Sequence, residues 1–434
     1  MRLAKRIGAI FGVLVVLLLA WIGLLSVTRG TPVRAVLAIG DRAGPPAVSD
    51  SLFAHTIEVY TGTHIESGNR VELLMNGDGT YPALWNDLRS AKQTITVQFY
   101  YCQPGVVADT FAMVLAERAR AGVRVLVLLD AFGAQNLLDD DDWVRTLESA
   151  GVELAQLRPL HWYSLHKATF RSHVRAVVVD GRIGYTGGFG LADYWMGDGR
   201  TEDQWRESNA RFTGPSVMWL QGMFAAAWAE ATGELLTGDT YFPREAFAEA
   251  GSVRAGLLFA TPTTGSTNAE RFMALSIASA KQRLYVSTSY FVPDDDFRAL
   301  LLAAARRGVD VRVLTAGDQS DVKTTMLAAR ARYEELLAGG VKIYEYLPTM
   351  MHAKTFVIDG RWLTIGSLNF DNRSLAFNNE SNLVVLDEAL GARMDSIFVE
   401  DLRHSKQIVL AEWRERGGWE KTKEWGASLL SRIL

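Results

Sequence analysis

Apolar residues along most of the chain fall into two spacings, one helical and one typical of strands. In the segment 109–130, apolar positions recur at helical intervals up to Ala-Arg-Ala-Gly-Val, where Gly122 suits the end of a helix, and a β-branched run follows. Strand–helix–strand units of this kind build sheets that are covered by helices. The pattern therefore predicts an α/β fold.

The same order of elements occurs twice along the chain. The run "QTITVQFYYCQPG" at 93–105 resembles "QRLYVSTSYFVPD" at 282–294, and the segment 109–130 resembles the segment 295–317. A chain of 434 residues is also longer than one compact core usually accommodates. The repeat therefore predicts two similar α/β halves.

Each half then reaches a short apolar strand that begins beside a histidine. The segments 172–190 and 351–369 match, and in both a basic residue lies two positions after the histidine and an aspartate lies seven positions after it. Residues two apart in a strand share a face, so each histidine and its basic neighbour point the same way. The repeated residues, including the glutamate of a downstream Glu-Ser-Asn sequence, are His173, Arg175, Asp180 and Glu207 in the first half and His352, Lys354, Asp359 and Glu380 in the second.

Two imidazoles that meet across a pseudo-twofold axis suit the chemistry of a phosphodiester. One neutral histidine attacks phosphorus to form a phosphohistidine, and the other, protonated, donates to the leaving alkoxide. Arg175 and Lys354 neutralise charge on the phosphate oxygens, and a carboxylate behind each ring, for which Glu207 and Glu380 are the candidates, fixes its tautomer. No cofactor is implied and no metal is expected, because no Cys, His or carboxylate cluster has ligand spacing.

The second histidine segment resembles a known motif in full. The spacing is that of the HKD motif of the phospholipase D superfamily, and it is carried by His352, Lys354, Asp359, Gly366, Ser367 and Asn369. The flanking sequences "GSLNFDNRS" and "NNESNLVV" are similar to those of bacterial cardiolipin synthases. The resemblance extends from about Val71 to Trp413, which is nearly the whole body of the chain.

The resemblance implies two pseudo-symmetric phospholipase D-like lobes, each a mixed β-sheet flanked by helices, with one active site at their interface. It implies transfer of a phosphatidyl group between two phosphatidylglycerol molecules, giving cardiolipin and glycerol. By analogy with the family, His173 is the nucleophile, His352 is the general acid, and Asp180 and Asp359 complete the catalytic motifs as anchors of local structure. The implied phosphate-binding residues are Arg175, Lys354, Ser367 and Asn369.

The first motif departs from the family pattern at three positions. Arg175 stands in place of lysine, Gly188 in place of serine and Gly190 in place of asparagine. Arginine keeps the charge but is bulkier and binds phosphate as a fork. Three alternatives to the transferase therefore stay open: a phospholipase D that releases phosphatidic acid, a nuclease, and a catalytically weak lipid-binding pseudoenzyme. The slight net charge of −4 and two motifs on one chain argue against the nuclease.

The N-terminus predicts a membrane anchor. "MRLAKR" is followed by 19 uncharged residues from Ile7 to Leu25, a length that suits a bilayer core of about 30 Å. A cleaved signal peptide is the rival interpretation. The resemblance and this segment together predict a single-pass protein of the bacterial inner membrane, and the flanking basic residues favour a body on the non-cytoplasmic side.

The end of the chain offers a second membrane contact. Trp413, Trp419 and Trp425 are spaced among charged residues, which is typical either of an amphipathic helix on lipid or of a helix packed on the body. The expected partners are phospholipids and a membrane, and no nucleic acid. We divide the chain into an N-terminal transmembrane anchor (1–28), a linker (29–70), a first lobe (71–235), a second lobe (236–402) and an amphipathic helical tail (403–434).

Overall fold

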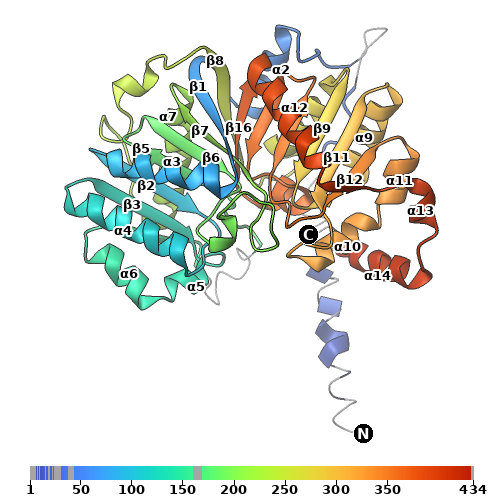
Figure 1. Cartoon of the computed structure of the whole chain (residues 1–434), viewed down its shortest axis with the longest axis horizontal. Helices are drawn as coiled ribbons and strands as arrows, with labels where there is room; N and C mark the ends of the chain where they lie inside the picture. Colours follow the sequence, from blue (N-terminus) through green and yellow to red (C-terminus); the bar gives the residue numbers. More distant parts are fainter. Residues whose placement is uncertain are drawn as a thin grey trace.

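The computed structural model describes residues 31–37, 44–159 and 169–431, together with scattered positions between 6 and 23 that are helical (Figure 1). The predicted anchor lies partly outside the described residues. Among those that are described, no helix combines the length and the apolar character needed to cross a bilayer. The anchor and the inner-membrane location therefore stay predictions.

A mixed sheet of 15 strands runs through both halves of the chain (Figure 1). The first half contributes β1 Glu66–Met75, β2 Thr94–Phe99, β3 Arg124–Asp130, β4 Glu153–Leu157, β5 Ala176–Val179, β6 Ile183–Gly187 and β7 Ser208–Thr213. The second half contributes β8 Val253–Ala260, β9 Arg283–Thr288, β11 Asp310–Ala316, β12 Lys342–Tyr346, β13 Thr355–Ile358, β14 Trp362–Gly366, β16 Glu380–Leu386 and β17 Ser405–Gln407. A separate parallel pair is formed by β10 Phe291–Val292 and β15 Phe370–Asp371.

The strand order repeats the sequence repeat. From the centre outwards it is β1-β7-β6-β5-β2-β3-β4 in the first half and β8-β16-β14-β13-β9-β11-β12 in the second, where β17 extends the edge. The two halves join where β1 and β8 pair antiparallel. Strands β2, β3 and β4 of the first half and β9, β11 and β12 of the second are parallel, whereas the inner strands and the edge strand β17 pair antiparallel. The predicted mixed α/β fold is confirmed, with the two expected sheets joined edge to edge.

Helices cover both faces of the sheet because the strands are apolar on both sides. Along β3, Val125, Val127 and Leu129 pack with one cluster, while Leu126 and Leu128 pack with another. The helices are α2 Leu52–Thr61, α3 Asn76–Ser90, α4 Val106–Arg120, α5 Gln135–Leu138, α6 Asp141–Glu148, α7 Ser216–Thr232, α8 Asn268–Ser279, α9 Asp295–Arg306, α10 Lys323–Arg330, α11 Tyr333–Ala338, α12 Glu388–Leu402, α13 Leu410–Arg414 and α14 Gly418–Ser428. Short 3₁₀ turns span η2 Asp193–Trp195 and η3 Arg244–Phe247, and a π turn spans η4 Arg373–Phe377.

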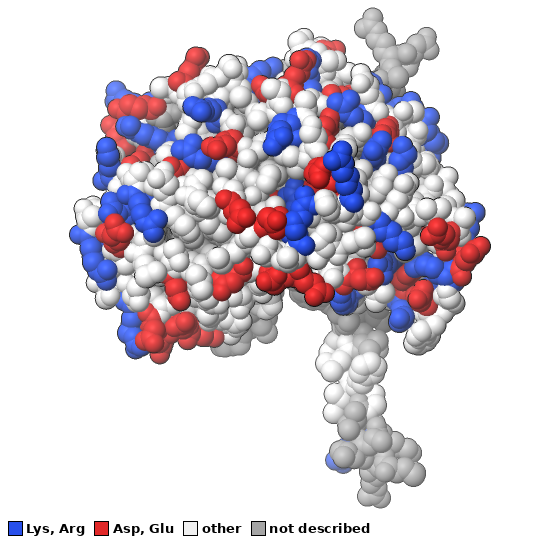
Figure 2. All heavy atoms as spheres, in the orientation of Figure 1, with Lys and Arg blue, Asp and Glu red and all other residues white. Residues whose placement is uncertain are grey.

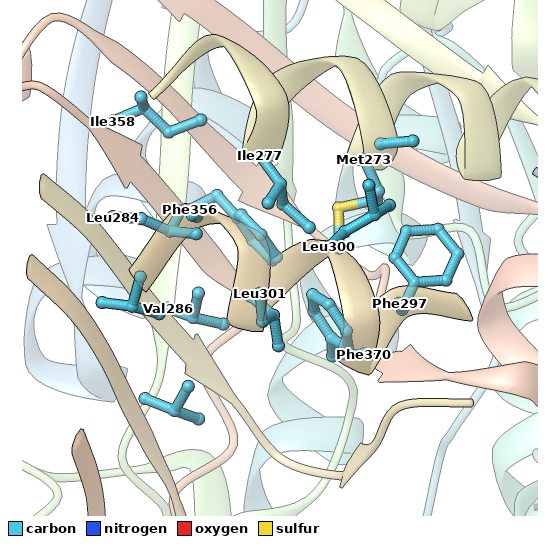
Figure 3. Packing of buried hydrophobic residues seen from close by; sticks show 14 of the residues in the cluster. Met273, Ile277, Leu284, Val286, Phe297, Leu300, Leu301, Phe356, Ile358 and Phe370 are labelled. Carbon is cyan, nitrogen blue, oxygen red and sulfur yellow. The ribbon is translucent and has the colours of Figure 1, made fainter. Parts of the chain in front are cut away.

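The core of the second half fixes the strand that follows His352. Figure 3 shows α8 and α9 side chains, among them Ile277 and Leu301, packed towards Phe356 of β13. The rings of Phe356 and Phe370 are stacked with centroids 5.6 Å apart. Strands β13 and β15 are therefore held by one apolar cluster, which places the two ends of the HKD motif relative to each other.

The segment predicted as a linker contains a buried helix. In α2, Phe53, Ala54 and Ile57 are buried in the core of the second half, and the ring of Phe53 lies 5.0 Å from that of Trp362. Strand β1 also begins before the predicted boundary, at Glu66. The apolar pattern of α2 is short, so the sequence alone does not show that this helix packs in the core. Its packing partners lie more than two hundred positions away along the chain.

The predicted helical tail is a strand followed by two short helices. Strand β17 pairs with β12, and α14 packs against α10. Trp413 is buried against the ring of Tyr333, whereas Trp419 and Trp425 are 73% and 63% exposed. The tail therefore packs on the body and still presents two indole rings to the surroundings. Ile433 and Leu434, which belong to the predicted tail, lie outside the described residues.

Candidate active site

Each histidine strand is fixed to the opposite half of the protein. The backbone N–H of His173 donates to the carbonyl of Asn379 at 2.8 Å, and that of His352 donates to the carbonyl of Arg206 at 2.8 Å. Asn379 and Arg206 directly precede Glu380 and Glu207, respectively. These two reciprocal bridges bring each histidine beside the glutamate of the other half.

His173 is held by one carboxylate and one carbonyl. Its Nδ1 lies 2.8 Å from Oε2 of Glu380 and 3.0 Å from the carbonyl oxygen of Ser367. Because a carbonyl oxygen only accepts hydrogen bonds, Nδ1 carries the proton and Nε2 keeps its lone pair. The ring of Tyr100 packs edge-on against the imidazole at 5.1 Å. Within the described parts of the chain, Nε2 is therefore the nitrogen without a hydrogen-bond partner.

His352 has the equivalent carboxylate and an additional cation. Its Nδ1 lies 2.5 Å from Oε2 of Glu207, and Nζ of Lys354 lies 3.0 Å from its Nε2. The rings of Trp195 and Trp205 flank the imidazole with centroids at 5.3 and 4.9 Å. The predicted glutamates thus contact the two imidazoles, each across the interface between the halves.

Burial changes the protonation of the whole cluster. It raises the pKa values of Glu207 and Glu380 to about 7, because their charged forms lose solvation. It lowers the pKa of Lys354 to about 7 for the same reason, and it lowers the pKa of each histidine well below its usual value. Several groups of the site therefore titrate close to neutrality.

Arg175 is buried and is oriented by backbone carbonyls. Its Nη1 donates to the carbonyl of His173 at 2.6 Å and its Nε to that of Phe189 at 3.2 Å. Its guanidinium lies 5.9 Å from the centre of the Tyr100 ring. Only 1% of the residue is exposed, so burial lowers the pKa of Arg175, yet the side chain lines the cavity described next.

Both imidazoles line a cavity of about 260 Å³, together with residues from neighbouring loops. Among the sequence-predicted residues, His173, Arg175, His352 and Asn369 line it, while Lys354 and Ser367 are buried behind that lining. Oδ1 of Asn369 is buried and has no hydrogen-bond partner within the described parts of the chain. The remaining lining residues are Tyr100, Tyr101, Trp195, Trp205, Tyr290, Asp321, Val322, Thr325, Asp371, Arg373, Ser374 and Asn378.

The motif aspartates lie away from this cavity. Asp180 and Asp359 have φ angles of +51° and +52°, and each carboxylate accepts backbone N–H groups at the start of a neighbouring strand. Asp180 binds the N–H groups of residues 92–94, and Asp359 those of residues 281–283. Their contacts fit anchors of the two strand turns.

The two glycines of the first motif make room for other side chains. A Cβ atom at Gly188 would lie 2.4 Å from Oε2 of Glu207, and one at Gly190 would lie 2.4 Å from the carbonyl of Tyr101 and 2.8 Å from the ring of Trp195. Nε1 of Trp195 donates to Glu207 at 3.3 Å. Trp195 thus fills the space that a longer side chain at position 190 would need.

Comparison with known proteins decides the family. A family profile described as "Cardiolipin synthase, PLD-like domain" matches residues 273–402. The chain is 32% identical to a cardiolipin synthase of Geobacillus kaustophilus over 375 residues, which cover 86% of this chain and 74% of that protein. It is 30% identical to cardiolipin synthase A of Pseudomonas syringae, with coverage of 92% and 84%. The chain belongs to the cardiolipin synthase-like proteins of the phospholipase D superfamily. It is a phosphatidyltransferase of that superfamily.

The fold has a close match among solved structures. The phosphatidylserine synthase of Haemophilus influenzae superposes with a TM-score of 0.68 at 13% sequence identity, and the match covers 88% of this chain and 99% of that one. At this identity the likeness concerns the fold alone.

Restoring the family residue at position 190 should damage this phosphatidyltransferase. We expect Gly190→Asn to lower headgroup release at least tenfold and the free energy of unfolding by about 1–3 kcal/mol, because the side chain overpacks against Trp195 and Tyr101. Denaturant unfolding and a headgroup-release assay measure both effects. Gly222→Asn is the control, since nothing lies within 4 Å of a Cβ there. A gain in turnover for Gly190→Asn would contradict this packing argument.

Activity should be greatest near pH 7. Below this pH Glu207 and Glu380 become protonated and stop acting as carboxylates towards the imidazoles, and above it Lys354 loses its charge. We therefore expect kcat/KM to fall on both sides when it is measured from about pH 5 to about pH 9. Lys354→Arg should move the alkaline limb to higher pH, since arginine stays charged. A flat profile would contradict this assignment.

Proposed function

We propose that this enzyme makes cardiolipin and glycerol from two phosphatidylglycerol molecules through a phosphohistidine. The observation that carries the proposal is the pair of imidazoles in one cavity, each bonded at Nδ1 to a carboxylate from the opposite half. Such a pair supplies a nucleophile and a proton donor around one phosphorus atom, without further groups. The bacterial cardiolipin synthases that this chain matches support the choice of substrate.

In the first step, Nε2 of His173 attacks the phosphorus of the donor lipid. The P–O bond to the glycerol headgroup breaks, and the leaving oxygen takes the proton from Nε2 of His352. The Nδ1–H of His173 stays directed at Ser367 and Glu380, which stabilise the positive charge that grows on the ring. The anionic phosphate raises the pKa of His352 when it binds, which favours the protonated form that this step requires.

In the second step, a hydroxyl of the acceptor lipid replaces the leaving group. His352 takes its proton, the oxygen attacks phosphorus, and the P–N bond to His173 breaks, which restores both histidines. Water in the same position would give phosphatidic acid. The aromatic rings of Tyr100, Trp195 and Trp205 line the cavity and favour a lipid headgroup over bulk water.

The cations have different tasks in this scheme. Arg175 and Asn369 line the cavity, so they contact the non-bridging oxygens of the phosphate. Lys354 contacts the ring of His352, and its charge lowers the pKa of that ring, which makes the protonated ring a stronger acid towards the leaving oxygen. Ser367 donates to Glu380 at 2.5 Å and positions that carboxylate. Asp180 and Asp359 hold the strand turns and touch no substrate.

A donor with an activated leaving group separates the two histidines. With phosphatidyl-p-nitrophenol, which needs no acid to leave, we expect His352→Ala to release p-nitrophenol in a burst and to accumulate phosphoenzyme. His173→Ala should release none, and both variants should make no cardiolipin from phosphatidylglycerol vesicles. Mass spectrometry of the products distinguishes cardiolipin from phosphatidic acid.

The opposite pattern would assign the nucleophile to His352. Unchanged cardiolipin synthesis in either variant would exclude the mechanism, and phosphatidic acid as the only wild-type product would favour the hydrolase. His55→Ala serves as the control, because that side chain is 72% exposed and lies outside the cavity. Over the face drawn in Figure 2, acidic and basic side chains of the described residues are interspersed, which does not favour a polyanionic nucleic acid as substrate.

We also propose that α14 rests on the lipid surface beside the cavity. Trp419, Trp425 and Leu429 are exposed on and just after this helix, and α14 packs on α10, whose Thr325 lines the cavity. Indole rings are favoured at the boundary between water and lipid. This placement would set the cavity close to the headgroups of its substrates.

Quenching by brominated lipids tests this contact. In the full chain bound to phosphatidylglycerol vesicles, the Trp419→Phe/Trp425→Phe double variant should lose a large part of the tryptophan quenching seen in the wild type. Trp413→Phe should not, because Trp413 is buried against Tyr333. Equal quenching in the wild type and the double variant would place α14 away from lipid.

A further inference from the structure

A tyrosine–aspartate pair that belongs to neither motif lies at the mouth of the cavity. The hydroxyl of Tyr290 lies 2.8 Å from Oδ1 and 3.0 Å from Oδ2 of Asp321, and both residues line the cavity. Tyr290 directly precedes β10, which pairs with β15, so its backbone lies beside Asn369. Tyr290 thus sits next to the last residue of the second motif, while Asp321 is exposed and open to a ligand.

The pair breaks the symmetry of the site. In the internal repeat, Tyr101 occupies the position of Tyr290, and its ring contacts the rings of Tyr194 and Trp195 with centroids 6.1 and 6.0 Å away. No carboxylate of the described residues is hydrogen-bonded to Tyr101. Such a hydrogen-bonded carboxylate is present on one side of the cavity mouth and not on the other. We therefore expect it to perform a task that belongs to that side alone.

The chemistry of the pair restricts what it binds. Tyr290 has one hydroxyl hydrogen, which it directs at Asp321, and a carboxylate carries only acceptor atoms. Towards the cavity the pair therefore offers lone pairs and negative charge. It attracts O–H or N–H groups and repels phosphate oxygens.

We propose that Tyr290 and Asp321 bind the free hydroxyl groups of a glycerol headgroup, first on the leaving glycerol and then on the acceptor lipid. The proposal rests on the function proposed above, in which His352 donates a proton to the leaving oxygen and accepts one from the attacking oxygen. Ser289, which directly precedes Tyr290, donates from its Oγ to the carbonyl of His352 at 3.0 Å, so the pair lies on the side of His352. By microscopic reversibility, one subsite holds the headgroup that leaves and the headgroup that enters.

A polyol suits this position better than an amine. Arg175 and Arg373 line the same cavity and Lys354 lies directly behind it, so three cations oppose an ammonium group, against the two lining carboxylates of Asp321 and Asp371. The group that must approach His352 is in any case a hydroxyl. The second hydroxyl of a vicinal diol can then donate to Asp321 while the first one reacts.

Competition between small alcohols tests the subsite. The full-length enzyme receives phosphatidyl-p-nitrophenol in detergent micelles, with 1-propanol and 1,2-propanediol as competing acceptors, and mass spectrometry gives the ratio of the two phosphatidyl products. We expect the wild type to prefer the diol, and both Asp321→Asn and Tyr290→Phe to reduce this preference about tenfold, because an acceptor for the second hydroxyl is weakened or lost. Both products form in the same reaction mixture, so their ratio is independent of any change in the overall rate of donor cleavage.

Asp318→Asn is the matched control. Asp318 lies three residues before Asp321, pairs with Arg330 at 2.9 Å and does not line the cavity, so its replacement should leave the ratio as in the wild type. A diol preference that is the same in all four proteins would overturn the inference. In a second competition, ethanolamine replaces 1-propanol. A wild type that prefers ethanolamine to the diol, and loses this preference in Asp321→Asn, would overturn the inference in favour of an amine site. No transfer to any alcohol would instead refute the proposed function.

Discussion

The reciprocal pairing of histidine and glutamate across the two halves is the constraint on which the site depends. His173 reaches Glu380, and His352 reaches Glu207, and all four side chains are buried. A buried carboxylate without a partner is strongly destabilising, so neither half can retain its glutamate at low cost if the other half moves away. The continuous sheet, joined at β1 and β8, keeps the halves in the one arrangement that satisfies both pairs.

Within this symmetric frame, single positions make the two sides different. In the second half the hydroxyl of Ser367 donates to Glu380, whereas in the first half Gly188 has no side chain and Glu207 occupies the space. Trp195 then takes the volume beside Gly190 and donates to Glu207. The departures of the first motif are therefore compensated by packing, and they do not by themselves indicate a damaged site.

The sequence predicts the repeated parts of the molecule well and the contributions from loops poorly. The succession of strands and helices along each half and the positions of both histidines follow from local periodicity and from the internal repeat. The sequence does not predict which glutamate pairs with which histidine. Each pair is a tertiary contact between the two halves, and its residues are 145 or 207 positions apart. For the same reason motif analysis does not identify α2, Trp195 or the pair of Tyr290 and Asp321, because each acts through contacts with residues far away along the chain.

The two cations of the duplicated motifs, Arg175 and Lys354, have different surroundings and different proposed roles. Among the described residues, the guanidinium of Arg175 bonds only to carbonyl oxygens, through Nε and Nη1, so the donors of Nη2 would be available to a phosphate. Arginine also stays charged over the working range of pH. Lys354 bonds to the ring of His352, and its pKa of about 7 lies where a proton must be exchanged. In the proposed mechanism, Arg175 would therefore hold the phosphate during both steps, while the charge of Lys354 would change together with the protonation of His352. On this argument the exchange of lysine for arginine at position 175 is compatible with activity, because the nucleophile's side needs fixed charge and only the side of His352 needs a charge that changes.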